Sequence, residues 1–244
     1  MLLTAPAAFA KETAQVRFLH AVPGVGDATL SAGGEEVGSA GFAEATDLVA
    51  VPAGESDLLL SASGGVEVEG SETLEPGSAY TVIAMAKGDG AELVTFADGN
   101  AKKGVARLRM IHAAPELGEP DLVVDGKTIA REAPFRDATR YRTFDPGSYE
   151  VEVADPDGGK PVVPAKALSL AAGTSSSAVI VGSRGEDARL IVVDDDITAP
   201  SSGPQAGFGG LADSGGRPWS LALLAALAAG LIGGAIFRRV KASR

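Results

Sequence analysis

The chain contains no cysteine, and this absence excludes several classes of protein at once. Without a thiol there is no disulfide framework, no thiolate zinc site and no cysteine nucleophile. Export from the cell stays compatible with this composition, because domains above roughly 80 residues fold on core burial alone. Aromatic residues are also scarce, at 5%, whereas the 244 residues include 32 glycines and 14 prolines. Such a composition favours short strands joined by tight turns.

Basic residues are outnumbered, 21 against 32 acidic ones, and the formal net charge is −11. The charge is unevenly spread: beyond Pro200 there are five basic residues and one acidic residue, a net of +4 that leaves −15 for the rest. An acidic body repels phosphate, so nucleic acid is not an expected partner. Solubility is sufficient to explain the acidic charge.

Motifs of catalysis are missing from the sequence as well. There is no Gly-x-Ser-x-Gly, no His-Glu-x-x-His, no Walker loop and no dinucleotide fingerprint. The glycine-rich residues 207–210 lie in linker-like sequence rather than between a strand and a helix. Paired carboxylates are too common in so acidic a chain for any pair to stand out. The sequence therefore predicts neither an enzyme nor a cofactor.

Two acidic clusters are candidates for a calcium site. Asp155 and Asp157 form one cluster and residues 194–196 the other, and carboxylates are the hard oxygen ligands that Ca²⁺ prefers. Neither cluster has the spacing of an EF-hand loop. We interpret both as solvated turns or strand ends, and no metal site is predicted.

The N-terminus resembles the end of a secretory signal peptide. It is apolar and closes with the small-x-small triplet Ala8-Phe9-Ala10, which predicts cleavage after Ala10. A positive n-region is missing and the apolar run is short, which indicates further signal sequence upstream of this start. Residues 1–10 are therefore interpreted as a signal-peptide remnant, with a frayed apolar terminus as the alternative.

The C-terminus carries the longest apolar run. Trp219 to Phe237 spans 19 residues without a charge, and as a helix it would cover about 28 Å, close to the hydrocarbon thickness of a bilayer. A basic tail at 239–244 follows, and the positive-inside rule places it in the cytoplasm and the bulk of the chain outside. A transmembrane helix is predicted at 218–238, with a buried soluble helix as the alternative.

Two glycines within that segment are a candidate helix-dimer face. Gly230 and Gly234 form a GxxxG pair, a spacing that lets two membrane helices approach closely. In a segment this rich in alanine and glycine the pair also arises by chance.

A Gly/Pro/Ser-rich stretch at 198–217 is predicted to tether the body to the membrane segment. It contains a pentapeptide that resembles a cell-wall sorting signal of the Leu-Pro-x-Thr-Gly type, or its Leu-Ala-x-Thr-Gly variant. The resemblance implies sortase cleavage before the last residue and covalent attachment to the wall. Serine stands where threonine is expected, so retention as a membrane span is the other reading. The five residues are Leu211, Ala212, Asp213, Ser214 and Gly215.

The body of the chain is an internal repeat. The segment 16–23 matches 108–115 at an offset of 92, and after one inserted residue 42–46 matches 135–139. Two copies of about 90 residues predict two domains of the same fold, at 14–99 and 105–197.

Each copy has the pattern of short strands. The run 122–124 leads into an Asp-Gly hairpin signal, Asp145-Pro146-Gly147 is a turn, and 148–153 alternates polar and apolar residues. No long 3.6-residue period occurs before residue 218. The sequence predicts an all-β body of two tandem antiparallel β-sandwich domains, immunoglobulin-like or transthyretin-like, followed by one C-terminal transmembrane helix.

The repeat pattern resembles the family called domain of unknown function 4397. The second copy carries it best, in segments 109–115, 121–126, 135–139 and 146–151, whereas the first has Gly33-Gly34 for Asp-Gly and Ala53-Gly54 for Pro-Gly. The resemblance covers roughly residues 15 to 196. It implies an extracytoplasmic sandwich, often in tandem, and no assigned activity.

Two histidines occupy the same place in each copy, just after a predicted strand. His20 precedes Pro23, and His112 precedes Pro115. Paired ligands would be a functional interpretation, but nothing nearby in the sequence supplies the further ligands that a metal needs. We interpret these signature residues as structural, each imidazole tying a strand end to the following proline turn by hydrogen bonds.

These features together predict a non-enzymatic cell-surface module, displayed outside the membrane for binding or as a spacer. A cell-wall polymer, carbohydrate, peptide or surface protein would be its ligand. The alternative is a secreted hydrolase or accessory domain acting on cell-envelope polymers, and a third hypothesis is a subunit of an envelope complex joined through the GxxxG pair. The expected location is the cell membrane in a single pass, or the cell wall after sortase attachment.

Overall fold

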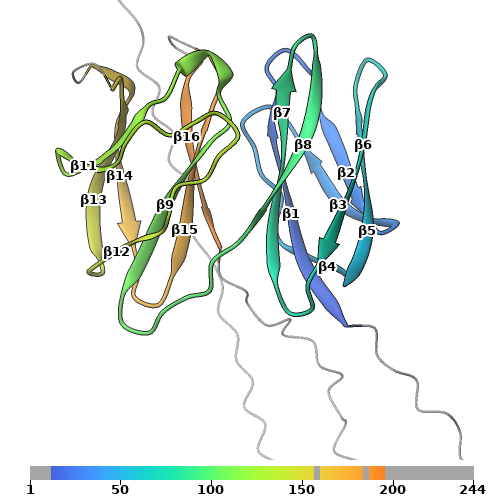
Figure 1. Ribbon diagram of the computed structural model, residues 1–244, viewed down its shortest axis with the longest axis horizontal. Coiled ribbons are helices and arrows are strands. Elements are labelled where there is room, and N and C mark those ends of the chain that lie inside the picture. The colour runs from blue at the N-terminus through green and yellow to red at the C-terminus, as the bar shows by residue number, and fades with distance from the viewer. Residues whose placement is uncertain (1–11, 157–159, 184–186, 196–244) are drawn as a thin grey trace, which may run out of the picture. The chain divides into compact units, whose positions relative to one another are not determined.

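The computed structural model describes residues 12–156, 160–183 and 187–195, and within these ranges nearly all regular structure is β-strand (Figure 1). One short 3₁₀ helix, η1 at Pro115–Leu117, is the exception in the described part. The expectation of an all-β body is thereby confirmed. No helix in the described ranges is both long and apolar enough to cross a membrane. The predicted remnant 1–10, tether 198–217, membrane helix 218–238 and tail 239–244 lie outside these ranges, as do the sorting pentapeptide and the GxxxG pair.

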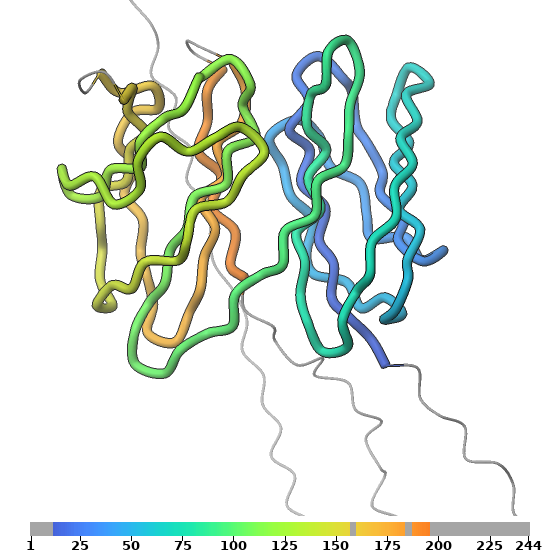
Figure 2. Tube along the Cα trace, viewed as in Figure 1, coloured from blue at the N-terminus to red at the C-terminus, as the bar shows by residue number. Residues whose placement is uncertain are grey.

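The first repeat folds as two sheets of four strands packed face to face (Figures 1 and 2). One sheet has the order β4-β1-β7-β8 and the other the order β3-β2-β5-β6. Their inner faces enclose a core that includes Phe18, Leu30 and Leu60. The strands are β1 (Thr13–Ala21), β2 (Ala28–Ala32), β3 (Glu35–Ala40), β4 (Val49–Pro52), β5 (Gly54–Ala62), β6 (Val66–Leu74), β7 (Ala79–Lys87) and β8 (Gly90–Ala97).

The second repeat has the same arrangement. Its sheets have the orders β12-β9-β15-β16 and β11-β10-β13-β14, and Leu108, Leu122 and Val151 lie in the core between them. The strands are β9 (Ala106–His112), β10 (Asp121–Val124), β11 (Lys127–Ala130), β12 (Arg142–Phe144), β13 (Gly147–Ala154), β14 (Pro161–Leu170), β15 (Ser175–Val181) and β16 (Arg189–Asp194).

One strand pair in each sandwich departs from the expected antiparallel pairing. β1 pairs with β7 in parallel, and β9 pairs with β15 in parallel, whereas the other ladders between described strands are antiparallel. The chain leaves the sheet after β1 to build strands of the opposite sheet and returns to lie beside it. Alternation along a strand does not reveal this, because a strand buried on both faces reads as a continuous apolar run.

The two sandwiches pack against each other through the outer faces of β1, β7, β9 and β15. Leu19 and Met85 of the first sandwich contact a cluster of the second that includes Ile111 and Val179. This explains why β7 is buried from Ala79 to Met85, while β5 alternates between buried and exposed side chains. Both sandwiches fall within one compact unit of the chain.

Candidate functional site

The two segments of the repeat signature, 16–23 and 42–46 in the first copy, form one structural element. In the first sandwich the loop 42–46 lies along β1: Ala43 N–H donates to the carbonyl of His20 (2.8 Å), and Thr46 N–H donates to the carbonyl of Phe18 (2.8 Å). The Thr46 hydroxyl oxygen in turn accepts the N–H of Phe18 at 3.0 Å. The threonine of the signature therefore serves as an additional backbone partner for the strand.

The second sandwich repeats these contacts with different side chains. Arg136 N–H donates to the carbonyl of His112 (2.9 Å), and the Thr139 hydroxyl accepts the N–H of Met110 (3.0 Å). Ala43 and Arg136 adopt φ of +66° and +69°, a region that non-glycine residues seldom occupy. The same backbone strain in both copies shows that this loop shape belongs to the fold.

The signature histidines lie in the interior and bond to the backbone. Nδ1 of His20 accepts the N–H of Val22 at 3.2 Å, and Nε2 lies 3.1 Å from the carbonyl of Gly26, which assigns the proton to Nε2. His112 places Nδ1 2.9 Å from the carbonyl of Ala133 and Nε2 2.8 Å from that of Ala114. Burial lowers the pKa of His112 despite these two acceptors.

The histidines are not brought together with other candidate ligands. Within the described residues, no group of three or more His, Asp or Glu side chains is placed to hold a metal ion. Of the acidic clusters, Asp194 ends β16 and is exposed, whereas Asp195 is fully buried. Asp157 and Asp196 lie outside the described residues. Pro23 and Pro115 are exposed, and Pro115 begins η1.

A buried network of charged side chains joins the two sandwiches. Arg17 on β1 donates from Nε to the Thr81 hydroxyl (3.0 Å), and from Nη2 to Asp98 (3.1 Å) and Asp195 (3.2 Å). Asp98 follows β8 of the first sandwich, and Asp195 follows β16 of the second. The guanidinium of the first repeat therefore reaches a carboxylate of the second.

Arg109 of the second repeat makes the corresponding contacts. Arg109 on β9 donates from Nε to the Ser177 hydroxyl (2.7 Å) and from Nη2 to Asp98 (2.9 Å) in the first sandwich. Its Nη1 donates to the carbonyl of Ala97 at 2.8 Å. Each arginine is thus held by a hydroxyl of its own sandwich and by a carboxylate of the other.

Tyr141 completes the network from the second sandwich. Its hydroxyl donates to Asp195 (2.7 Å) and accepts the N–H of Gly99 (2.9 Å), a residue between the two sandwiches in the chain. Asp195 also accepts the Ser177 hydroxyl at 2.7 Å. Burial, followed by the negative charge of Asp98, raises the pKa of Asp195 to about 6, and burial also raises the pKa of Tyr141.

The charged groups of this network are buried and paired with one another. The two arginines and two aspartates are at most 7% exposed, and their charges are balanced within the cluster. Sequence reasoning missed these residues. The available signal was the position of Arg17 and Arg109, since an arginine recurs at the same place in both copies, directly before two large apolar residues.

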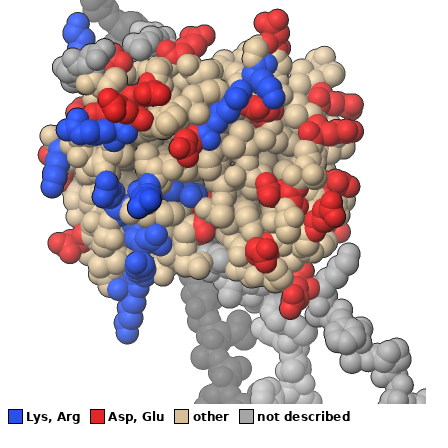
Figure 3. All heavy atoms as spheres, in the orientation of Figure 1, with Lys and Arg blue, Asp and Glu red and all other residues tan. Residues whose placement is uncertain are grey.

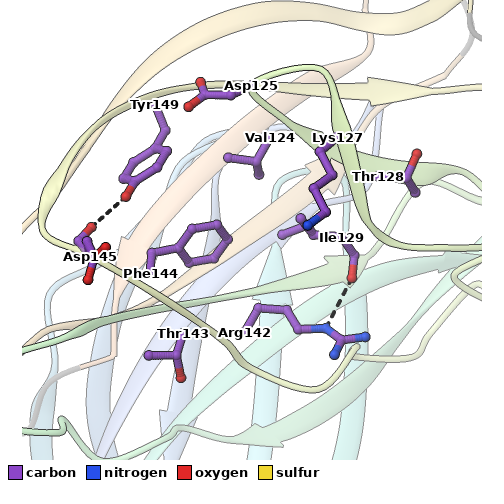
Figure 4. A pocket seen from close by; sticks show the side chains of 10 residues that line it. All are labelled: Val124, Asp125, Lys127, Thr128, Ile129, Arg142, Thr143, Phe144, Asp145 and Tyr149. Carbon is purple, nitrogen blue, oxygen red and sulfur yellow. Dashed lines mark hydrogen bonds between the residues drawn. The ribbon is translucent and has the colours of Figure 1, made fainter.

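An open cleft lies elsewhere, at one edge of the second sandwich (Figure 4). It has a volume of about 820 Å³ and lies between β11 of one sheet and β12 of the other. Sequence reasoning did not single out these positions as a site. The lining residues are Val124, Asp125, Lys127, Thr128, Ile129, Arg142, Thr143, Phe144, Asp145 and Tyr149.

The floor of the cleft is apolar. Phe144 and Tyr149 meet edge to face with ring centroids 5.3 Å apart, and both rings pack with Ile129 against the core. The Tyr149 hydroxyl donates to the carbonyl of Asp145 at 2.6 Å, which fixes the ring in place. Aromatic rings that are half-buried and held in this way offer a rigid apolar surface.

Charged groups stand around this floor. Arg142 Nε donates to the carbonyl of Ile129 at 3.1 Å, which bridges from β12 to β11 across the cleft. Lys127 begins β11 and has no carboxylate within ion-pair distance among the described residues. Asp125 accepts the N–H of Glu150 at 2.8 Å. The cleft therefore combines an apolar floor with two cations and two carboxylates.

The first sandwich differs at the corresponding edge: β3 packs against β1 and β4, whereas β11 makes no comparable contact with β9 and β12. The residues at matching positions also differ. Val51 and Ser56, both buried, replace the two aromatic residues of the floor. Glu35 stands at the position of Lys127, and Val49 at that of Arg142.

The two repeats also differ in their total charge, and the second repeat is again the more basic one. Residues 12–99 include two basic and fifteen acidic residues, whereas residues 100–195 include thirteen basic and fifteen acidic ones. On the face shown in Figure 3, basic side chains gather over the second sandwich. The difference in basic residues between the two copies was therefore a signal in the sequence that the second copy is specialised.

A comparison with families of known proteins gives two overlapping matches to one family model, at residues 14–119 and 106–206. No curated protein matches the chain. The matched ranges contain both sandwiches and both copies of the signature, and together they cover well over half of the sequence. The chain therefore belongs to the family described as domain of unknown function (DUF4397), of which it carries two copies.

Proposed function

We propose that the protein is a non-enzymatic binding module of the cell surface, in which the second sandwich holds a ligand and the first supports it. The cleft between β11 and β12 carries this proposal. Ligand sites are typically concave and largely apolar, with a few polar groups that orient the ligand. The aromatic floor and the charged rim of the cleft have this character.

The lining of the cleft favours binding over catalysis. Its hydroxyl side chains are Thr128, Thr143 and Tyr149, of which Tyr149 donates to the backbone, and none of the lining residues is a histidine that would activate a hydroxyl. The buried network at the junction of the sandwiches supports the same proposal, because it keeps the second sandwich fixed on the first. A ligand bound in the cleft is then held at a defined place on the displayed body.

The proposed location follows from the sequence beyond the described residues. Segment 218–238 would anchor the chain in the membrane, with the tail 239–244 inside and both sandwiches outside. Intact mass and partition between wall and membrane fractions test this part. A C-terminus at Ser214 in the wall fraction would establish sortase attachment, and an intact chain in the detergent-soluble fraction would establish a single-pass anchor.

Binding is tested by capture of isolated cell-envelope polymers on the immobilised full chain. We expect capture by the native protein and its loss in the variant Arg142→Gln, which removes a rim charge at the cleft. Arg189→Gln is the matched control, because Arg189 is an exposed arginine of the same sheet that does not line the cleft. Equal capture by both variants, or none by the native chain, would refute the cleft as the binding site.

A further inference from the structure

We propose that the cleft of the second sandwich binds an acidic saccharide: a sugar ring on the aromatic floor, with its anionic group between Lys127 and Arg142. This inference rests on the proposed function and names its ligand class. The two cations come from opposite walls of the cleft, Lys127 from β11 and Arg142 from β12. An anion held between them would bridge the two sheets.

The guanidinium of Arg142 is oriented for contact with an anion. Its Nε is occupied by the carbonyl of Ile129, which orients the guanidinium at the rim. Among the described residues no hydrogen bond or ion pair uses its two Nη nitrogens. A planar guanidinium with free Nη groups binds carboxylate or phosphate oxygens with defined geometry. Figure 4 shows the side chain of Lys127 extending into the ring of lining residues rather than away from it.

The floor suits the apolar face of a sugar. The rings of Phe144 and Tyr149 are half-buried, and the Tyr149 hydroxyl already donates its proton to the backbone, so this surface meets a ligand mainly through its ring carbons. The negative face of an aromatic ring attracts the weakly positive C–H groups that line one side of a pyranose. An apolar floor of this kind adds nothing to the binding of a bare inorganic anion.

The two carboxylates of the cleft narrow the class of ligand further. Asp125 and Asp145 also line the cleft, and they balance the two cations. They would repel a polyanion or a free phosphate, whereas they accept hydrogen bonds from sugar hydroxyls. A ligand that carries one anionic group among several hydroxyl donors satisfies both kinds of charge.

The test measures binding of four probes to the full chain in detergent by calorimetry. The probes are a neutral hexose oligomer that ends in one hexuronic acid (the hexuronate oligomer), the fully neutral hexose oligomer of the same linkage, inorganic phosphate and polyglutamate. We expect binding of the hexuronate oligomer, at least tenfold weaker binding of the neutral one, and affinity for the hexuronate that falls with added salt. Lys127→Gln and Arg142→Gln should each weaken hexuronate binding about tenfold.

Matched variants keep the test specific. Lys166→Gln, on β14 of the same sheet as Lys127 and outside the cleft, and Arg189→Gln should leave hexuronate binding unchanged. Equal affinity for the neutral oligomer, or tighter binding of phosphate or polyglutamate, would overturn the ligand class. If no probe binds but envelope polymers are still captured in an Arg142-dependent way, the saccharide assignment fails while the proposed function stands.

Discussion

At the scale of single residues, the most consequential side chains are the arginine and aspartate pairs at the junction of the sandwiches. Burying a charge is costly unless it is paired and fully hydrogen-bonded. Arg17 and Arg109 meet this condition only because each uses a carboxylate that the other repeat supplies or shares. Removing one partner leaves the others buried without compensation.

Replacing Arg109 by methionine should therefore lower the free energy of unfolding by about 3–5 kcal/mol. The change removes the bonds to Ser177, Ala97 and Asp98 and leaves Asp98 with one arginine. Arg131→Met is the control, since its guanidinium is 74% exposed and its pair with Asp121 should contribute less than about 1 kcal/mol. Urea denaturation measures both, and equal losses would contradict the role of burial.

The raised pKa of Asp195 predicts a pH dependence. Its value of about 6 in the folded protein exceeds the ordinary 3.8, so the folded state binds the proton more tightly than the unfolded state. The contribution of this group to stability is then greatest near pH 4 and declines as the pH rises toward 6. The stability of the native protein relative to Asp195→Asn should fall by about 2–3 kcal/mol between pH 4 and pH 7.

Thermal unfolding of the native protein and Asp195→Asn across this pH range checks the prediction. The neighbouring exposed residue provides the control, because Asp194→Asn alters a carboxylate at the surface. A stability difference between the native protein and Asp195→Asn that does not vary with pH would contradict the predicted titration.

At the scale of elements, the sequence predicted the strands well and their partners poorly. Alternation and turn residues predicted the strands around Asp125-Gly126 and Asp145-Pro146-Gly147 because these signals are local. The bond from Arg17 to Asp195 joins residues 178 positions apart, and no local pattern encodes such a pairing. The parallel ladder between β1 and β7 was missed for the same reason.

The cleft was missed for a different physical reason. It depends on a few positions where the copies differ, such as Glu35 against Lys127, and on how closely β11 approaches β12. A shared repeat pattern emphasises what the copies have in common, so it points to the structural histidines and threonines. Comparison of the differences between copies would have selected the charged rim, although not the open space between the strands.

The connection between β8 and β9 carries a steric constraint that is testable. A Cβ at Gly99 would lie 2.5 Å from Cε2 of Tyr141, so Gly99→Ala forces the ring to move and disturbs the bond to Asp195. We expect a loss of about 1–3 kcal/mol, seen as a lower Tm. Gly70→Ala on β6, whose Cβ would meet atoms no closer than 3.9 Å, should leave Tm nearly unchanged or raise it. The same loss in both would exclude the contact with Tyr141 as the cause.

At the scale of the whole molecule, we expect the described body to unfold as one cooperative unit. Its two cores are joined by a third apolar cluster, and the charged network seals one part of that contact. Neither sandwich presents this face to water in the intact chain. Separate unfolding of one sandwich would expose this apolar cluster to water and would leave the arginines and aspartates of the charged network without partners.

Calorimetry should therefore show a single unfolding transition whose van't Hoff and calorimetric enthalpies agree for the body as a whole. Met85→Glu, which places a charge in the shared cluster, should lower Tm and separate the transition into two. Leu59→Glu is the control, because Leu59 is 41% exposed and lies on the outer face of the first sandwich. Two transitions in the native chain would contradict the predicted coupling.

The arginine of each copy pairs with an aspartate of the other copy, and this arrangement bears on the ancestry of the chain. Because Arg17 and Arg109 occupy equivalent positions and each reaches toward the other copy, the junction has the self-complementary form of a twofold dimer interface. A progenitor with a single copy would have buried the same face by pairing with a second molecule. In a fused chain this pairing does not require two identical partners, so the two copies can differ at positions away from the junction, as they do at the cleft of the second sandwich.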